Sequence, residues 1–477
     1  MPFDAPILFP AIAEMTLLGA ICVVLLVDIF LSDQQRNTTY VLAMLALIVT
    51  AAALLMYGVE NRTVTFAGSF VADGAGTVLK MFAFLVVAMV FLYSREYLID
   101  AGLFKGEFFV LSLFGLLGIM VMISAYSLLT VYLGLELLSL SLYALVAFDR
   151  KSPQAAEAAM KYFVLGAIAS GILLYGVSLI YGTTGTIGLG ELAVILADPS
   201  QASIPTLVGV GLVVIGIAFK FGAVPFHMWL PDVYEGSPTP VTLYLASAPK
   251  LAAFALAWRV LVEGLGGLGA SWQDMLTVLA VLSMGLGNVV AIAQTNLKRM
   301  LAYSTISHVG FILLGFVAGT EEGLRGALFY TLTYVLMATA AFAMIILLSR
   351  KGFEAELLSD FKGLNARSPW FAFMMLLIMF SMAGVPPMVG FYGKLVVIAP
   401  ILDAGMLWLA LVAVLFSVIG AYYYLRVVWY MYFAEAESDQ PLVAETDFRL
   451  LISANCLALL ILGIFPGQLL EVCAAVF

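Results

Sequence analysis

The stretch Thr206-Leu-Val-Gly-Val-Gly-Leu-Val-Val-Ile-Gly-Ile-Ala-Phe-Lys220-Phe-Gly-Ala-Val-Pro225-Phe-His227-Met-Trp-Leu-Pro-Asp-Val233 is longer than the ~20 residues that one straight helix needs to cross a bilayer. Pro225 lacks an amide hydrogen and clashes with the preceding helical turn, so carbonyls upstream lose their partners. Unpaired backbone at membrane depth is tolerated only where protein or water satisfies it. The stretch therefore predicts a broken membrane-spanning helix beside a polar interior.

The composition of the whole chain agrees with a membrane setting. Of its 477 residues, 64% are hydrophobic and 11% are charged, whereas a soluble domain has ~25% charged residues. A soluble fold of this length would have too few polar residues to cover its surface. We therefore expect an all-α polytopic membrane protein, and we exclude a secreted disulfide scaffold, a nucleic-acid binder and a cytosolic enzyme.

Apolar runs separated by polar breaks predict about fourteen transmembrane helices. Their approximate centres are residues 19, 47, 83, 115, 137, 168, 214, 251, 284, 309, 337, 386, 419 and 460. The first ten residues contain Asp4 and no Lys or Arg, so we expect no cleavable signal peptide. The first apolar run, from about residue 7 to 31, is then the first span.

The basic residues between these spans predict the orientation. With the N-terminus outside, the outside connections contain only Arg62 and Arg325. The inside connections contain Arg36, Arg95, Lys105, Arg150, Lys151, Lys298, Arg299, Arg350, Lys351, Lys362, Arg367 and Arg449. This asymmetry follows the positive-inside rule and predicts that both termini face outward.

Several cations fall inside the predicted spans, where each charge costs on the order of 2.5–3.5 kcal/mol. They are Lys80, Lys161, Lys220, Lys250, Arg259, Lys394 and Arg426. Residues near span ends can extend their charge to the interface, but Lys250 lies at the middle of its span. The mid-membrane acid is Glu136. A bundle that only packed would have no use for these charges.

A second span contains a similar break. Its sequence is Ala383-Gly384-Val385-Pro386-Pro387, and Lys394 follows. A proline kink alone is more often a packing device. Breaks at corresponding positions of two halves, each with a lysine close by, indicate an inverted repeat and an ion path near the bilayer midplane.

Glu136 and a nearby lysine can form a switch. Burial disfavours the charged form of a lysine, and a neighbouring carboxylate favours it. When the pair opens, the lysine tends to release its proton to the next acceptor. A row of such lysines linked by water is a proton relay. The alternative is a static ion pair that fixes helix register.

The remaining candidate residues are two histidines and three cysteines. His227 and His308 each lie near a helix break or end, and neutral imidazole both accepts and donates protons. We expect either supporting relay roles or ordinary core positions for them. The cysteines (Cys22, Cys456, Cys473) have no CxxC spacing, so we expect packing roles and no metal or iron–sulfur site in this chain.

The motifs resemble the antiporter-like subunits of proton-pumping NADH:quinone oxidoreductase (respiratory complex I). The resemblance rests on Gly106-Glu107 with its apolar run, Leu133-Gly-Leu-Glu136-Leu-Leu-Ser139, the segment from Lys220 to Asp232, Tyr234-Glu-Gly-Ser-Pro-Thr-Pro240 and Gln294-Thr-Asn-Leu-Lys-Arg-Met-Leu-Ala-Tyr-Ser-Thr-Ile-Ser-His308. It covers almost the whole chain.

The resemblance favours the subunit N branch of bacterial enzymes. The chain lacks the long lateral helix of the largest paralogue, and it has Lys394 where a second paralogue has Glu. The resemblance implies that Glu136 pairs with Lys220, and that Lys161, Lys250 and Lys394 are the other ionisable residues of the relay. It also implies that helices 4–8 and 9–13 are two inverted five-helix repeats with broken helices 7 and 12.

These implications give a division of the chain and a setting. We expect an N-terminal three-helix segment (1–104), two repeats (105–265 and 266–434) and a C-terminal loop with helix 14 (435–477). The resemblance implies no cofactor in this chain, with flavin and iron–sulfur clusters in partner subunits. Expected partners are the other membrane and peripheral subunits of complex I, a neighbouring antiporter-like subunit, lipid, protons and water, but no nucleic acid. The expected location is the bacterial inner membrane, multi-pass, with both termini periplasmic.

Three functions stay open on sequence alone. The first is a proton-translocating, non-redox subunit of the oxidoreductase. The second is a subunit of a cation/proton antiporter, because such proteins share the Glu–Lys motif. The third is a membrane anchor with vestigial charges.

Overall fold

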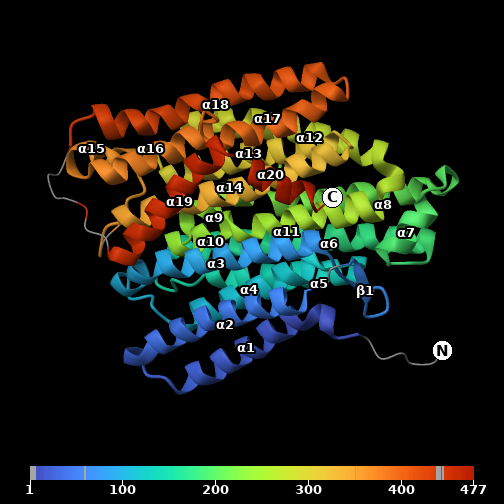
Figure 1. Cartoon of the computed structure of the whole chain (residues 1–477), viewed down its shortest axis with the longest axis horizontal. Coiled ribbons are helices and arrows are strands. Elements are labelled where there is room, and N and C mark those ends of the chain that lie inside the picture. The colour runs from blue at the N-terminus through green and yellow to red at the C-terminus, as the bar shows by residue number, and fades with distance from the viewer. Residues whose placement is uncertain (1–6, 59–60, 350, 437–441, 443–444, 477) are drawn as a thin grey trace.

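The computed structural model describes residues 7–58, 61–349, 351–436, 442 and 445–476. Arg350, one of the basic residues used to predict the orientation, lies outside the described residues. Long helices lie side by side in one bundle, with α1 and α2 at one edge and α18 at the opposite edge (Figure 1).

The first six crossings are single helices. They are α1 (Ile12–Phe30), α2 (Arg36–Tyr57), α3 (Gly74–Asp100), α4 (Gly106–Ile123), α5 (Leu128–Val146) and α6 (Pro153–Thr184). The next two crossings are assembled from shorter pieces. They are α8 (Ile204–Phe221) with α9 (Trp229–Gly236), and α10 (Thr239–Ala246) with α11 (Ala248–Ala257) and the π-helix η4 (Trp258–Gly264).

The second half repeats this mixture of long and short helices. Its members are α12 (Gly269–Ala293), α13 (Leu297–Val317), α14 (Glu321–Leu348), α16 (Pro369–Ala383) with α17 (Val389–Asp403), α18 (Leu407–Phe433) and α19 (Thr446–Ile464). The connections contain α7 (Leu189–Leu196), α15 (Leu364–Arg367), α20 (Gly467–Ala474), the 3-10 turns η1 (Phe9–Ala11), η2 (Asp33–Gln35), η3 (Pro199–Gln201), η5 (Gly266–Leu268) and η6 (Leu358–Phe361), and the antiparallel hairpin β1 (Thr63–Thr65) and β2 (Phe70–Ala72).

The fourteen predicted crossings and the two broken helices are confirmed. Within the described residues, thirteen helices are long and apolar enough to cross a membrane. The pair α16 and α17, each too short alone, supplies the remaining crossing. A third interruption was not predicted. The eighth crossing leaves helical geometry at Ser247 (φ −112°, ψ −91°), between α10 and α11. Pro249 favours a helix start there, and it is the sequence signal that could have revealed the interruption.

Burial separates the centre of the bundle from its rim. The apolar window of α14 is 100% buried and that of α13 is 94% buried, whereas only 28% of the α1 window is. Helices that are hydrophobic all round and exposed on one face fit a lipid boundary. The charged side chains that matter for function must therefore be carried by the inner helices or be covered by a neighbour.

Two helix crossings are close because glycine lies at the contact. A Cβ on Gly118 of α4 would lie 2.6 Å from the Leu138 amide nitrogen of α5, and one on Gly134 of α5 would lie 2.8 Å from the Met122 amide of α4. The crossing of α12 and α13 has the same design at Gly287 and Gly310. Small residues at such positions let helix backbones approach each other within a membrane.

We predict that Gly118→Ala destabilises the fold by about 1–3 kcal/mol, because the added methyl group would meet backbone atoms that cannot rotate away. The matched control is Gly19→Ala on α1, where a Cβ meets nothing within 4 Å. The measurement is thermal unfolding of the chain in detergent, followed by maleimide labelling of the buried Cys456 and Cys473. Equal midpoints for the two variants would contradict the prediction.

Candidate functional site

The first break brings a buried lysine to the end of a helix. The α8 helix ends at Phe221 because Gly222 adopts a left-handed conformation (φ 81°), and Pro225 lies in the segment before α9. The last carbonyls of a helix have no partner within the helix and carry partial negative charge. Lys250, which is 2% exposed on α11, donates from Nζ to the Phe221 carbonyl at 2.8 Å.

The second break has the same arrangement. The α16 helix ends at Ala383, Gly384 is left-handed (φ 82°), and Pro386 and Pro387 lie before α17. Lys394 of α17 donates from Nζ to the Ala383 carbonyl at 2.7 Å and to the Ser417 hydroxyl at 2.8 Å. Both breaks therefore place a buried ammonium at the negative end of a half-helix, which offsets part of the energetic cost of burying that charge.

Glu136 and Lys220 each form a hydrogen bond with a serine hydroxyl. Lys220 Nζ, in the last turn of α8, donates to the Ser139 hydroxyl of α5 at 3.2 Å. Ser170 of α6 donates to the Glu136 carboxylate. A cavity of about 20 Å³ is lined by Ser139, Ser170 and Lys220, and it has room for one water.

No direct ion pair joins Glu136 to Lys220 among the residues that the structure describes. The pairing that the resemblance implies is therefore open in this structure, and each of the two side chains contacts a different serine hydroxyl. Lys250 belongs to the same region, because its ammonium binds the carbonyl of Phe221, the residue that follows Lys220.

His308 lies at the centre of a buried aromatic cluster. Its Nδ1 is 2.8 Å from the Tyr330 hydroxyl, and its Nε2 is 3.0 Å from the Tyr424 hydroxyl. The Tyr424 hydroxyl is also 2.5 Å from the Ser304 hydroxyl. Phe311, one turn from His308, stacks on Tyr330 at 6.0 Å and lies under the Lys394 ammonium at 5.2 Å. The histidine and the lysine of the second break therefore belong to one cluster.

The tyrosines and serines of these clusters were not predicted. Tyr330, Tyr424, Ser139, Ser170 and Ser417 resemble ordinary residues of apolar helices in the sequence. Only their distance from the ionisable side chains distinguishes them, and that distance comes from helix packing.

Two predicted site residues lie apart from these clusters. The Lys161 side chain is 43% exposed on α6, where its Nζ pairs with Glu157 at 2.8 Å and with Asp232 at 2.7 Å. Lys161 therefore does not point into the bundle, because its helix lies at the rim. His227 is half-buried in the first break, and no hydrogen bond in the described part of the chain joins its ring to a lysine.

A second acid lies within the bundle in addition to Glu136. Glu14 of α1 is 2.5 Å from Lys80 of α3, and both side chains are buried. The sequence analysis treated Glu136 as the mid-membrane acid and overlooked Glu14, although Glu14 lies within the first apolar run. Its burial against Lys80 depends on how α1 packs on α3.

Another buried cation, Arg259, forms ion pairs at the end of the bundle near β1. Arg259 is fully buried and pairs with Asp73 at 2.8 Å and with Glu263 at 3.0 Å. Burial acts to raise the pKa of Asp73, but the Arg259 guanidinium and the Gly76 amide outweigh it and lower that pKa below its ordinary value. Asp73 also caps α3 through that amide, so this cluster fixes helix ends.

Among the described residues, no group of three His, Cys, Asp or Glu side chains could hold a metal ion. The free cysteines Cys456 and Cys473 are buried and Cys22 is exposed. The expectation that cofactors lie in other chains stays a prediction.

Known proteins share this sequence over nearly its full length. The model of the family described as NADH:quinone oxidoreductase/Mrp antiporter, TM, matches residues 125–420. NADH-quinone oxidoreductase subunit N of Thioalkalivibrio sulfidiphilus (strain HL-EbGR7) is 56% identical over 99% of this chain and 98% of its own length. The chain belongs to the subunit N family of NADH-quinone oxidoreductase.

Solved structures share the fold of this chain. A chain of respiratory complex I from Thermus thermophilus with bound Aureothin is 33% identical, has a TM-score of 0.82, and is matched over 96% of this chain and 98% of that chain. A chain of the Mrp complex from Dietzia sp. DQ12-45-1b also has a TM-score of 0.82, over 98% of this chain and 96% of that one, but is only 22% identical, so it shows the shared fold alone. The matched range 125–420 contains Glu136, Lys220, Lys250, His308 and Lys394.

We predict opposite effects on stability for two buried lysines. Lys80→Met would leave Glu14 buried without its partner and destabilise the fold by about 3–5 kcal/mol. Lys250→Met would remove a cation that has no carboxylate partner, so we expect the stability to be unchanged or higher. Thermal unfolding in detergent measures both.

The double variant Glu14→Gln/Lys80→Met is the control for the paired lysine, and it should recover most of the loss. A loss of stability for Lys250→Met as large as that for Lys80→Met would contradict the prediction that only the lysine paired with a carboxylate stabilises the fold.

Proposed function

We propose that this chain is a non-redox, proton-translocating subunit of the oxidoreductase, in which buried Lys, Glu and His side chains and water move protons. Redox chemistry in other subunits would supply the energy. The observation that carries this proposal is the pair of buried lysines at helix breaks, Lys250 and Lys394, each bound to a carbonyl. An ammonium with donors to spare and no carboxylate nearby is suited to exchange protons.

The proposed path runs from the inside through the first break, along Lys220, Lys250 and His308, and outward by Lys394. The Glu136 carboxylate favours the charged form of Lys220, and each of the two side chains contacts a serine hydroxyl. His308 belongs to the Lys394 cluster, because the Lys394 ammonium lies over the ring of Phe311, which stacks on the Tyr330 that His308 contacts. In the proposed path it receives the proton from the first lysine cluster. Lys161 is assigned a role at the margin of the first half, as the resemblance implies, and His227 is assigned a supporting role because it lies in the first break.

We further propose that residues 105–265 and 266–434 are two inverted repeats, preceded by an N-terminal segment (1–104) and followed by a C-terminal loop and helix (435–477). The close glycine crossings of α4 with α5 and of α12 with α13 support this division. The two breaks also support it, because each begins with a glycine, Gly222 or Gly384, in the same left-handed backbone conformation.

The setting follows from the same assignment. Flavin and iron–sulfur clusters belong to partner subunits, and the partners are the other membrane and peripheral subunits, with an antiporter-like subunit as a neighbour. The location is the bacterial inner membrane, with both termini on the periplasmic side, as the distribution of basic residues supports.

A cation/proton antiporter is the second candidate, because the matching family includes Mrp antiporters. The 56% identity to a subunit N favours the oxidoreductase. Antiport activity in vesicles from a strain without redox subunits would favour the antiporter.

We predict that Lys220→Ala, Lys250→Ala and Glu136→Ala each reduce NADH-driven proton pumping about tenfold or more while the complex still assembles. Each substitution removes a group that would hold or control a proton inside the bundle. The assay is proton uptake into proteoliposomes containing the purified complex, together with NADH:quinone turnover. Lys105→Ala, at an exposed lysine before α4, is the control. Normal pumping by all three assembled variants would reject the proposal.

A further inference from the structure

The Asp232 carboxylate lies between two cations that belong to different halves of the chain. Its Oδ2 is 2.7 Å from Lys161 Nζ on α6, and its Oδ1 is 2.8 Å from Arg299 Nη1 on α13. Arg299 also pairs with Glu235, one turn further along α9, at 2.7 Å. Because α9 is the half-helix that follows the first break, Asp232 links that half-helix both to α6 and to the second half of the chain.

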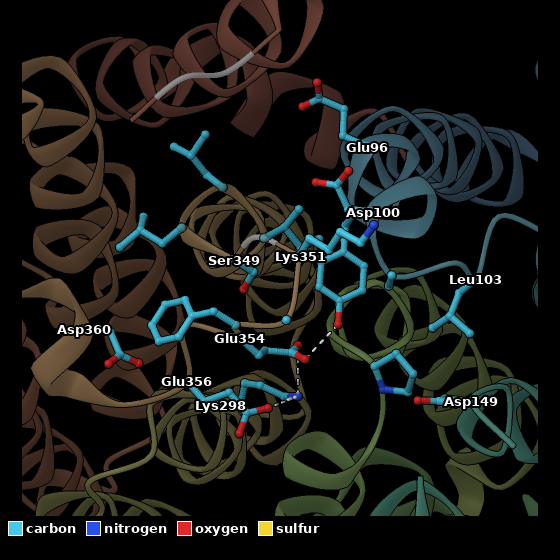
Figure 2. Close-up of a pocket in the computed structure, with 18 of the residues that line it drawn as sticks. Glu96, Asp100, Leu103, Asp149, Lys298, Ser349, Lys351, Glu354, Glu356 and Asp360 are labelled. Atoms are coloured by element: carbon cyan, nitrogen blue, oxygen red, sulfur yellow. Dashed lines mark hydrogen bonds and ion pairs between the residues drawn. The ribbon is translucent and has the colours of Figure 1, made fainter. Parts of the chain in front are cut away.

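The second half also holds the far end of α9. Lys298, which precedes Arg299 on α13, is 1% exposed and donates from Nζ to the Ser237 carbonyl, at the end of α9, at 2.9 Å. Figure 2 shows Lys298 with its carboxylate partners Glu354 and Glu356, which lie in the connection after α14. Consecutive cations of α13 therefore fix α9 along its side and at its end.

The start of α9 forms part of the wall beside Lys220. Trp229, the first residue of α9, stacks on Tyr162 of α6 with ring centroids 4.5 Å apart and an interplanar angle of 13°. Its Nε1 donates to the carbonyl of Phe219, the residue before Lys220, at 3.1 Å. Trp229, Tyr162 and Lys220 all line the cavity of about 20 Å³ described above. The position of α9 therefore sets the shape of that cavity.

The ion pair between Lys161 and Asp232 lies next to this ring stack. Tyr162 follows Lys161 in α6. Asp232 lies three residues after Trp229, so the two residues are neighbours on the surface of α9. The ion pair and the ring stack therefore join the same two helices. A movement of α9 that broke the ion pair would also move the wall of the cavity at Lys220.

We propose that Asp232 and Lys161 are positioning residues for the first break, which hold α9 so that Trp229 closes the cavity at Lys220. Lys161 is then an anchor and not a carrier of protons. Its ammonium has carboxylates at 2.7 and 2.8 Å, whereas those of Lys250 and Lys394 bind backbone carbonyls. The inference rests on the proposed function, because it takes Lys220 as a member of the relay, and it specifies the role of Lys161 there.

Two alternatives give different expectations for Lys161. The first is that it carries protons, and the second is that it forms a surface ion pair, which contributes little to a fold. An arginine at this position separates the first alternative from the anchor. Its guanidinium can pair with a carboxylate, but it does not release its proton in proteins. An arginine would therefore retain an anchor and block a proton carrier.

The chain offers a matched control for the ion pair. Glu157 pairs with the same Lys161 ammonium at 2.8 Å, but it lies four residues earlier on the same helix. Glu157→Gln therefore removes a carboxylate from Lys161 without releasing α9. Asp232→Asn makes the same chemical change at the residue that joins the helices.

The test compares Lys161→Arg, Lys161→Met, Asp232→Asn and Glu157→Gln in the purified complex in proteoliposomes. We expect Lys161→Arg and Glu157→Gln to retain NADH-driven proton uptake, per assembled complex, within about twofold of wild type. Lys161→Met and Asp232→Asn should lower it about threefold to tenfold, because a small displacement beside a reacting group is costly. The double variant Lys161→Met/Asp232→Asn should pump as well as Asp232→Asn, because both changes remove one shared interaction.

The inference is overturned if assembled Lys161→Arg pumps no better than Lys161→Met, or if Asp232→Asn pumps like Glu157→Gln. An equally low uptake for both Lys161 variants would make this lysine a proton carrier. Should Asp232→Asn fail to assemble, the two Lys161 variants still decide, because the Lys161 side chain is 43% exposed at the rim.

Failure of the proposed function would look different. In each of the overturning outcomes, loss of pumping by assembled Lys250→Ala leaves the proposed function standing. Normal pumping by assembled Lys250→Ala would reject the proposed function, whatever the variants of Lys161 show.

Discussion

The structure depends on placing lysine ammonium groups at the carbonyl ends of interrupted helices. A cation in the middle of an apolar bundle is costly, and an unpaired carbonyl at the same depth is costly as well. The two breaks let each defect offset the other, since Lys250 binds Phe221 and Lys394 binds Ala383. The glycine that ends each first half-helix and the prolines that follow are needed because the carbonyls must be free. The packing of the surrounding helices then holds the lysines in place.

Much of this could be predicted from sequence, because the bilayer imposes strong rules. Span length, the proline breaks and the lysines inside apolar runs are one-dimensional features, so the fourteen crossings and both breaks followed from them. Residues such as Glu136, Lys220 and Lys394 were recognisable because a charge in an apolar run is conspicuous. The interruption at Ser247 was missed, because its proline lies two residues into an otherwise unbroken apolar pattern.

The partners of each charge could not be predicted, because they are set by which helix faces meet. Lys161 and Lys250 are both lysines in apolar helices, yet one lies at the rim and the other at the centre. Lys298 follows a polar connection and was taken as a loop residue, but the connection after α14 folds over it and buries it. The serines and tyrosines that contact the charges are common in membrane helices and carry no signal of their own.

The buried cations of the described chain fall into two kinds, and the difference bears on mechanism. Lys80, Arg259 and Lys298 each lie within 4 Å of at least one carboxylate, and these ion pairs join helices to one another or to the connections between them. Lys220, Lys250 and Lys394 have only hydroxyl or carbonyl partners. A carbonyl or hydroxyl can accept a hydrogen bond from an ammonium or from a neutral amine, whereas a carboxylate strongly favours the ammonium, so loss of the proton costs less here than it would beside a carboxylate. A relay needs that balance, because a group that holds its proton too firmly cannot pass it on.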